Sequence, residues 1–232
     1  MRADAQMSGR ADIETRTIAL VSGLDSCIMT ALLAPTYHEV TPLFIRSGLQ
    51  WEDAELAALE RFFNVHNAES VRPVVELEFG GGSLYRGHWS TGGSAVPDAM
   101  APDSEFFLPG RNLLLLSAAA TYGAIKDISN IAIGILKSNP FPDARREFLQ
   151  SIEKTAGLAL ERKYSILTPL LEMHKADVLR AGQAFPIELS LSCADPVGGE
   201  HCGLCGKCGE RRRGFIDAQV PDRTRYVTLG PL

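Results

Sequence analysis

Residues 17–27 read Thr-Ile-Ala-Leu-Val-Ser-Gly-Leu-Asp-Ser-Cys, and this stretch decides the fold. Its first five residues are apolar or β-branched, which is typical of a strand buried on both faces of a sheet. A polar turn over 22–26 follows, and a helical pattern over 27–34 ends at Pro35, because proline cannot continue a helix. A strand, a turn and a helix in this order predict one unit of a parallel sheet.

The rest of the chain repeats this alternation of strands and helices. Further strands are predicted over 40–45, 71–77 and 130–136, and further helices over 51–63, 113–124, 144–159 and 175–184. The sequence therefore predicts an α/β fold, a parallel sheet with helices on both faces. Such sheets bind ligands at the carboxyl ends of their strands, so we expect the site in the loops after Val21, Ile45 and Leu136.

Composition sets the broad class of the protein. The chain has 232 residues, of which 45% are hydrophobic and 22% charged, with a net charge of −5. These values are those of an average globular domain, and they exclude a disordered chain, a collagen and a solenoid. The mild negative charge argues against general attraction to nucleic acid or to an anionic membrane.

Two segments have no regular pattern, and one apolar stretch is short. Residues 1–16 are charged and lack an apolar core, so we expect a flexible lead and not a signal peptide. Residues 80–109 are rich in Gly, Ser and Pro and are expected to form a lid or a disordered loop. The most apolar stretch, 113–125, is shorter than the ~18–20 residues of a spanning helix. A cytoplasmic location is the expectation.

Four of the five cysteines, Cys193, Cys202, Cys205 and Cys208, lie within sixteen residues of one another. In a cytosolic chain such clustering favours metal over disulfides, and thiolates suit tetrahedral zinc. A disulfide pair, an iron–sulfur cluster and reduced buried cysteines are the alternatives. Four thiolates would close the coordination shell, so this zinc would hold structure and take no part in the chemistry. His201 is either a substitute ligand or a bystander.

The turn at 22–26 is a candidate anion site. At a helix N-terminus, backbone N–H groups and the hydroxyls of Ser22 and Ser26 can donate to phosphate oxygens. Asp25 fits beside an anion if it holds Mg²⁺ or orders the loop. An ordinary turn with a serine helix cap is the alternative. Cys27, which follows, is either a sulfur carrier or a small buried residue.

Three further motifs carry charged residues at predicted element boundaries. Arg111, in Pro-Gly-Arg-Asn, can clamp a phosphate or a carboxylate through two hydrogen bonds. Asp143 is a candidate helix cap, and its position after a strand gives Asp143 or Arg145 access to a ligand. Lys175, just before a helix, can neutralise charge that develops on phosphate. Ordinary solvated surface residues are the alternative for the arginine and the lysine.

Taken in order, these motifs resemble the 7-cyano-7-deazaguanine synthase family of the PP-loop ATP pyrophosphatases. The resemblance covers nearly the whole chain, from about residue 17 to residue 217. LVSGLDSC is similar to the family's pyrophosphate loop Ser-Gly-Gly-x-Asp-Ser, LPGRN to its Pro-Gly-Arg-Asn, and FPDARREF to its Tyr-Pro-Asp-Cys-Arg-Pro-Glu-Phe. TPLLEMHKADV and the cysteine cluster, before an Arg-rich helix, complete the series.

The resemblance implies a fold, a reaction and partners. The fold is that of the adenine nucleotide alpha hydrolases, an ATP-binding domain over 17–190, with a small C-terminal zinc module over 191–232. The reaction is the ATP-dependent conversion of 7-carboxy-7-deazaguanine and ammonia to 7-cyano-7-deazaguanine, through an acyl-adenylate, an amide and a second activation. The implied partners are these small molecules, with no nucleic acid and no membrane, in a homodimer.

The resemblance also implies roles for individual residues. Catalysis falls to Asp25, Ser26 and Lys175. Arg111, Asp143 and Arg145 contact the substrate, and the four cysteines bind Zn²⁺. ATP and Mg²⁺ are held by the pyrophosphate loop, which comprises Leu20, Val21, Ser22, Gly23, Leu24, Asp25, Ser26 and Cys27.

Two departures from the family pattern motivate two alternative functions. The loop has one glycine, Gly23, where the family has two, and this favours a non-catalytic nucleotide-binding protein with a decayed loop. Residues 137–140, Lys-Ser-Asn-Pro, replace the family's Asp-Tyr-Ser-Gly. This second change favours the same adenylation chemistry with a different amine, so that a deazaguanine-like carboxylate is joined to a protein or a small molecule.

Overall fold

Five parallel strands form the centre of the structure, a computed structural model in which residues 14–232 are described. Their order across the sheet is β3-β2-β1-β4-β5. The strands are β1 (Glu14–Leu20), β2 (Tyr37–Arg46), β3 (Val75–Glu78), β4 (Asn130–Ala132) and β5 (Ser165–Leu167). The chain builds outward from β1 to β3, then returns to the other side of β1, which creates a switch point between β1 and β4.

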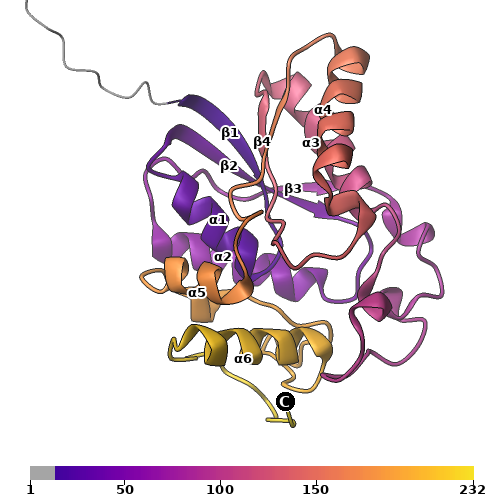
Figure 1. Cartoon of the computed structure of the whole chain (residues 1–232), viewed down its shortest axis with the longest axis vertical. Coiled ribbons are helices and arrows are strands. Elements are labelled where there is room, and N and C mark those ends of the chain that lie inside the picture. The colour runs from indigo at the N-terminus through magenta and orange to yellow at the C-terminus, as the bar shows by residue number, and fades with distance from the viewer. Residues whose placement is uncertain (1–13) are drawn as a thin grey trace, which may run out of the picture.

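Helices cover both faces of the sheet, which confirms the predicted fold class (Figure 1). Helices α3 (Arg111–Lys126) and α4 (Arg146–Leu160) pack on one face. The layer on the opposite face contains α1 (Leu24–Leu33), α2 (Glu52–His66) and α5 (Lys175–Gly182), and α6 (Gly206–Ala218) packs against α5. Within residues 14–232, no helix is long and apolar enough to cross a membrane.

Strand β1 shows why residues 17–21 are apolar throughout. Ile18 and Leu20 pack among α3 and α4, whereas Ala19 and Val21 pack against the opposite layer of helices. All four are buried because successive side chains of a central strand point to opposite faces. The flexible lead predicted over residues 1–16 is too long, because β1 begins at Glu14. Residues 1–13 lie outside the described part of the chain.

Strands β3, β4 and β5 differ from the sequence prediction. The strand predicted over 71–77 starts too early, because β3 begins at Val75. The prediction of a strand over 130–136 is too long, because β4 ends at Ala132 and the chain then turns past the phosphate-loop candidate. There, a Cβ on Gly134 would lie 3.5 Å from the Ser26 backbone nitrogen. Strand β5 was not predicted at all, because a three-residue strand shows no measurable periodicity.

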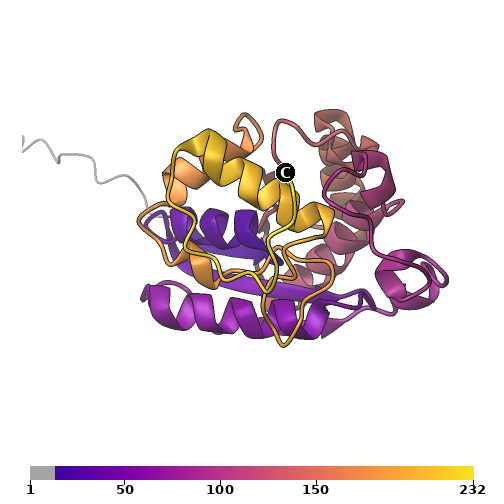
Figure 2. The same cartoon turned by 90° about the horizontal axis from the view of Figure 1, so that it is seen from below.

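A third core cluster joins the C-terminal segment to the rest of the molecule. It contains all four clustered cysteines, together with Trp51 before α2 and the 80–109 residues Tyr85, Trp89 and Leu108. The 80–109 segment is therefore packed and includes three short 3-10 helices, at Gly81–Ser83, Trp89–Thr91 and Asp103–Phe106. Helix α6 lies at the lower end of the molecule in Figure 1 and faces the viewer in Figure 2.

Candidate active site at the carboxyl ends of the strands

The turn between β1 and α1 is closed by the hydroxyl of Ser26. This oxygen accepts a hydrogen bond from the Ser22 N–H at 2.8 Å and donates one to the Gly23 carbonyl at 2.9 Å. Gly23 occupies the cap position of α1, and no side chain caps the helix, so the serine-cap alternative is not what forms. The Asp25 and Ser26 N–H groups of the first helical turn have no acceptor within the helix, which leaves them for an anion.

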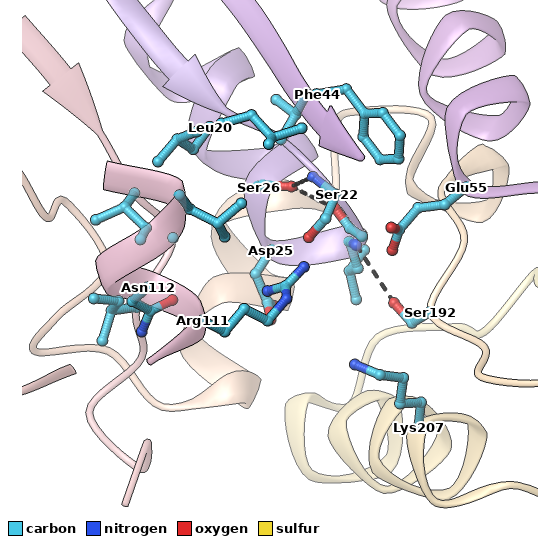
Figure 3. A pocket seen from close by; sticks show the side chains of 18 of the residues that line it. Leu20, Ser22, Asp25, Ser26, Phe44, Glu55, Arg111, Asn112, Ser192 and Lys207 are labelled. Atoms are coloured by element: carbon cyan, nitrogen blue, oxygen red, sulfur yellow. Dashed lines mark hydrogen bonds between the residues drawn. The ribbon is translucent and has the colours of Figure 1, made fainter. Parts of the chain in front are cut away.

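Gly23 packs tightly against the segment that leads to the first clustered cysteine. A Cβ at this position would lie 2.9 Å from the Leu191 carbonyl oxygen and 3.3 Å from the Ser192 hydroxyl. The Leu24 N–H also donates to that hydroxyl at 3.4 Å (Figure 3). Only glycine fits at position 23 without displacing the loop or the neighbouring segment.

A three-member ion cluster lies beside the loop. The Lys175 ammonium contacts Asp25 Oδ2 at 2.7 Å and Glu210 Oε1 at 2.9 Å. Burial lowers the pKa of Lys175, but the two carboxylates outweigh it and hold the pKa above its usual range, so the lysine stays charged. Asp25 Oδ1 is buried and accepts no hydrogen bond from the described residues, which leaves an oxygen of the kind that Mg²⁺ binds.

Arg111 begins α3, directly after Gly110, whose φ of 70° lies in the left-handed region. The Arg111 Nε is buried, and within residues 14–232 no atom accepts its hydrogen. In Figure 3, Arg111, Glu55 and Lys207 surround the loop from different sides. An unpaired guanidinium N–H in such a place is ready to bind a phosphate or a carboxylate.

Asp143 does not cap α4, contrary to the sequence prediction. It instead holds the start of α3, where Arg111 lies. Its carboxylate accepts the Asn112 N–H at 2.9 Å, and the Asn112 side-chain amide donates to the Asp143 carbonyl at 3.1 Å. Asp143 thus fixes the start of α3 and also lines a cavity. Arg145 takes the cap position of α4 and is exposed, and it lines neither cavity described below.

Two adjoining cavities of about 190 and 490 Å³ lie at the carboxyl ends of β1, β2 and β4, where the sheet topology predicts a ligand site. Ser22, Asp25, Arg111 and Lys175 line both. The smaller cavity is also lined by Leu20, Val21, Gly23, Leu24 and Ser26. Cys27, the last residue of the expected loop, does not line the cavity and is fully buried. Burial raises the pKa of its thiol, which fits a packing role and not sulfur transfer.

The larger cavity has an aromatic wall. Trp51 and Trp89 stack with their ring centroids 5.6 Å apart, and the edge of Phe106 meets Trp89. Trp51, Trp89, Phe106 and Phe141 all line this cavity, whose polar groups include Asp143. Stacked rings of this kind suit a flat heterocycle.

Sequence reasoning missed three charged residues that line both cavities: Glu55, Lys207 and Glu210. Glu55 resembled the solvated face of an amphipathic helix, yet only 7% of it is exposed. Lys207 lies within the cysteine cluster and Glu210 just after it, and the sequence pattern there indicates metal binding but not a contribution to the cavities. Helix α6 of the C-terminal segment therefore contributes to the site, whereas the four cysteines do not line the cavities.

The four clustered cysteines form a compact metal-binding set. Their sulfurs lie within 4.8 Å of one another, all four residues are buried, and none forms a disulfide. The Cys193–Cys205 and Cys202–Cys208 sulfur pairs are each 3.9 Å apart. A tetrahedral zinc with Zn–S bonds of about 2.3 Å requires about 3.8 Å. Residues Cys193, Cys202, Cys205 and Cys208 therefore fit the predicted zinc.

His201 belongs to the bystander alternative, because its ring makes another contact. Its Nε2 accepts the Ser192 N–H at 3.0 Å, and the Ser192 hydroxyl in turn accepts the Leu24 N–H. The metal-binding segment is thus tied to the phosphate-loop candidate through one histidine and one serine.

Comparisons with known proteins agree with these features. The family model described as "Queuosine biosynthesis protein QueC" matches residues 16–219, which include the loop, the cavities and the four cysteines. A 7-cyano-7-deazaguanine synthase of Anaeromyxobacter sp. (strain Fw109-5) is 33% identical over 230 residues, covering 91% of this chain and 96% of the relative. One from Methanothrix thermoacetophila is 32% identical over 228 residues, covering 91% and 98%.

Proposed function

Because the chain belongs to the QueC family of queuosine biosynthesis proteins, we propose that it converts 7-carboxy-7-deazaguanine and ammonia to 7-cyano-7-deazaguanine with ATP. The observation that carries this proposal is the pair of adjoining cavities. One contains an anion-binding loop with unpaired donors, and the other has an aromatic wall sized for a small heterocycle. No observation favours the other-amine or the non-catalytic alternative.

ATP occupies the smaller cavity in this proposal. The Asp25 and Ser26 N–H groups of α1 bind phosphate oxygens, and the Ser26 hydroxyl closes the loop through its two hydrogen bonds. Asp25 Oδ1 would hold Mg²⁺, which would neutralise charge on the phosphates. Lys175, which donates to the other oxygen of Asp25, would stabilise the charge that develops on the leaving pyrophosphate.

The carboxylate substrate stacks in the larger cavity, beside Trp51 and Trp89. Arg111, at the junction of the cavities, orients the carboxylate toward the α-phosphorus of ATP. Attack there forms an acyl-adenylate and releases pyrophosphate. Ammonia converts the adenylate to an amide, and a second ATP activates the amide for dehydration to the nitrile.

The four cysteines hold a structural Zn²⁺, which rigidly links the start of α6 to the segment before it. A homodimer, a cytoplasmic location and the absence of a nucleic-acid partner, all expected from the sequence, remain part of the proposal.

The direct test is pyrophosphate release with Mg²⁺, ATP, 7-carboxy-7-deazaguanine and ammonium, followed by mass analysis of the product. We expect pyrophosphate only when the acid is present, and a product with the mass of the nitrile. Absence of acid-dependent pyrophosphate release, with ammonium and with other amines, would exclude the proposed enzyme.

A further inference from the structure

Glu55 is a buried carboxyl whose protein contacts do not explain its burial. It lies on α2 and is 7% exposed. No group among residues 14–232 forms a hydrogen bond or a close ion pair with its carboxylate. Glu52, one turn earlier, is also buried, but its oxygens accept the Ser47 and Gly48 N–H groups at 2.6 and 3.2 Å. Buried carboxyls are normally paired in this way, and an unpaired one in a cleft marks a functional group.

The position of Glu55 places it next to the reacting atoms of the proposed reaction. It lines both cavities, and its Oε1 lies 3.8 Å from where a Cβ on Gly23 would be. Figure 3 shows its carboxylate directed toward the loop at Ser22. A group at this point faces the junction between ATP in one cavity and the acid in the other.

Charged groups reach Glu55 from each element packed around it. They are Lys207 of α6, Arg111 of α3 and Glu52 of its own helix, with Asp25 of α1 lining the same cavity. Burial raises the pKa of Glu55 to about 7, although the two basic side chains oppose the shift. A carboxyl of this kind exchanges protons near neutral pH, as a general base must.

We infer that Glu55 is the general base that removes protons from the amine nitrogen. The inference rests on the proposed function. In the first step the nitrogen of ammonia bonds to the acyl carbon, and the bond from that carbon to the AMP oxygen breaks. AMP leaves with the electron pair, and the cationic nitrogen passes one proton to Glu55, which returns it to solvent.

The same carboxylate serves the second activation. The amide oxygen bonds to the α-phosphorus of another ATP, and pyrophosphate leaves. The nitrogen then loses its two protons, one after the other, to Glu55, which passes each to solvent. The carbon–oxygen bond breaks with its electrons on AMP, and the carbon–nitrogen triple bond forms. One base facing one nitrogen thus accounts for all three protons that ammonia loses.

The test is Glu55→Gln, which keeps the size of the side chain and removes the base. Adenylation is measured as acid-dependent exchange of pyrophosphate into ATP without ammonium, and it stays close to the wild-type rate. Amide and nitrile formation with ammonium falls by about 10²–10⁴-fold. Hydroxylamine forms a cationic adduct that is acidic enough to lose its proton to water, so it still gives the hydroxamate at close to the wild-type rate. The wild-type pH profile rises around pH 7, and the variant lacks this rise.

Glu52→Gln is the matched structural control, since it loses backbone hydrogen bonds on the same helix. It should lower exchange, hydroxamate and nitrile formation in equal proportion. Nitrile formation by Glu55→Gln at the wild-type rate overturns the assignment, as does a parallel loss of exchange and hydroxamate. In either case an active wild type leaves the proposed function intact, whereas an inactive wild type refutes both.

Discussion

Lys175 determines the charge balance of the cleft, because its ammonium lies between the carboxylates of Asp25 and Glu210. Lys175→Met leaves both carboxylates without their cation and removes the charge that we propose stabilises pyrophosphate. We expect pyrophosphate release to fall by about 10²–10³-fold. Lys154→Met, at an exposed position on α4, is the matched control. Equal turnover in the two variants would contradict the role of Lys175.

Glu55 makes folding stability depend on pH in a predictable direction. Its pKa is raised from an ordinary 4.5 to about 7, mainly by burial. Below pH 4.5 the carboxyl is protonated in both the folded and the unfolded chain. As pH rises toward 7 the unfolded chain ionises first, so the folded state loses up to about 3 kcal/mol of relative stability.

Glu55→Gln lacks this contribution. The free energy of unfolding of the variant, minus that of the wild type, should therefore grow between pH 5 and pH 7.5 and then level off. Urea unfolding at four pH values measures this difference. A difference that stays constant across the range would show that the carboxyl is not perturbed by burial.

At the scale of elements, the single glycine of the phosphate loop is set by how α1 meets the C-terminal segment. Gly23→Ala brings a Cβ to 2.9 Å from the Leu191 carbonyl oxygen. The loop or the segment must shift, and we expect a loss of about 1–3 kcal/mol in stability with a higher KM for ATP. Gly80→Ala, where no atom lies within 4 Å of the added Cβ, is the control. Equal thermal midpoints for the two variants would rule out this contact.

Helix α6 connects the metal-binding cysteines to the cleft. It begins directly after Cys205, and within its first five residues it contributes Lys207 and Glu210 to both cavities. Glu210 reaches Lys175 at the start of α5, so two helices from different parts of the chain share one ion cluster. The cysteine cluster therefore fixes the position of residues that line the site.

At the scale of the whole molecule, the C-terminal segment is packed into the third core cluster, with residues from Leu49 to Cys208. This cluster contains residues on both sides of the domain boundary that the sequence predicts at residue 190. We expect one cooperative unfolding transition by calorimetry, and a chelator or Cys205→Ser should move that single transition to lower temperature. Cys27 is not one of the four clustered cysteines, so the Cys27→Ser variant should keep the bound metal.

Two results would contradict this prediction. Separate transitions for the two parts of the chain would show that the C-terminal module folds alone. Stoichiometric iron and sulfide in protein purified without oxygen would replace zinc with an iron–sulfur cluster.

Much of the fold could be predicted from the sequence, because the hydrophobic pattern of a strand or a helix is contained in consecutive residues. The apolar run at 18–21, the turn at 22–26 and the Cys-x2-Cys spacings are local patterns, and each corresponds to a local structure. Strand β5 was missed because three residues are too few to show a period. Arg145 was assigned to the substrate from its position after a strand and from the family motif, and the structure places it, exposed, at the cap of α4.

The sequence by itself determined the parallel sheet, the turn at 22–26 between β1 and α1, the four-cysteine cluster and the family, since these depend on spacing along the chain. Only the tertiary structure decided which charged side chains share the cleft. Lys175 meets Asp25 across 150 residues, and Glu55 and Lys207 reach the same cavities from α2 and α6. Such partners are brought together by the packing of helices on a sheet, and no local pattern records which distant side chains that packing will place side by side.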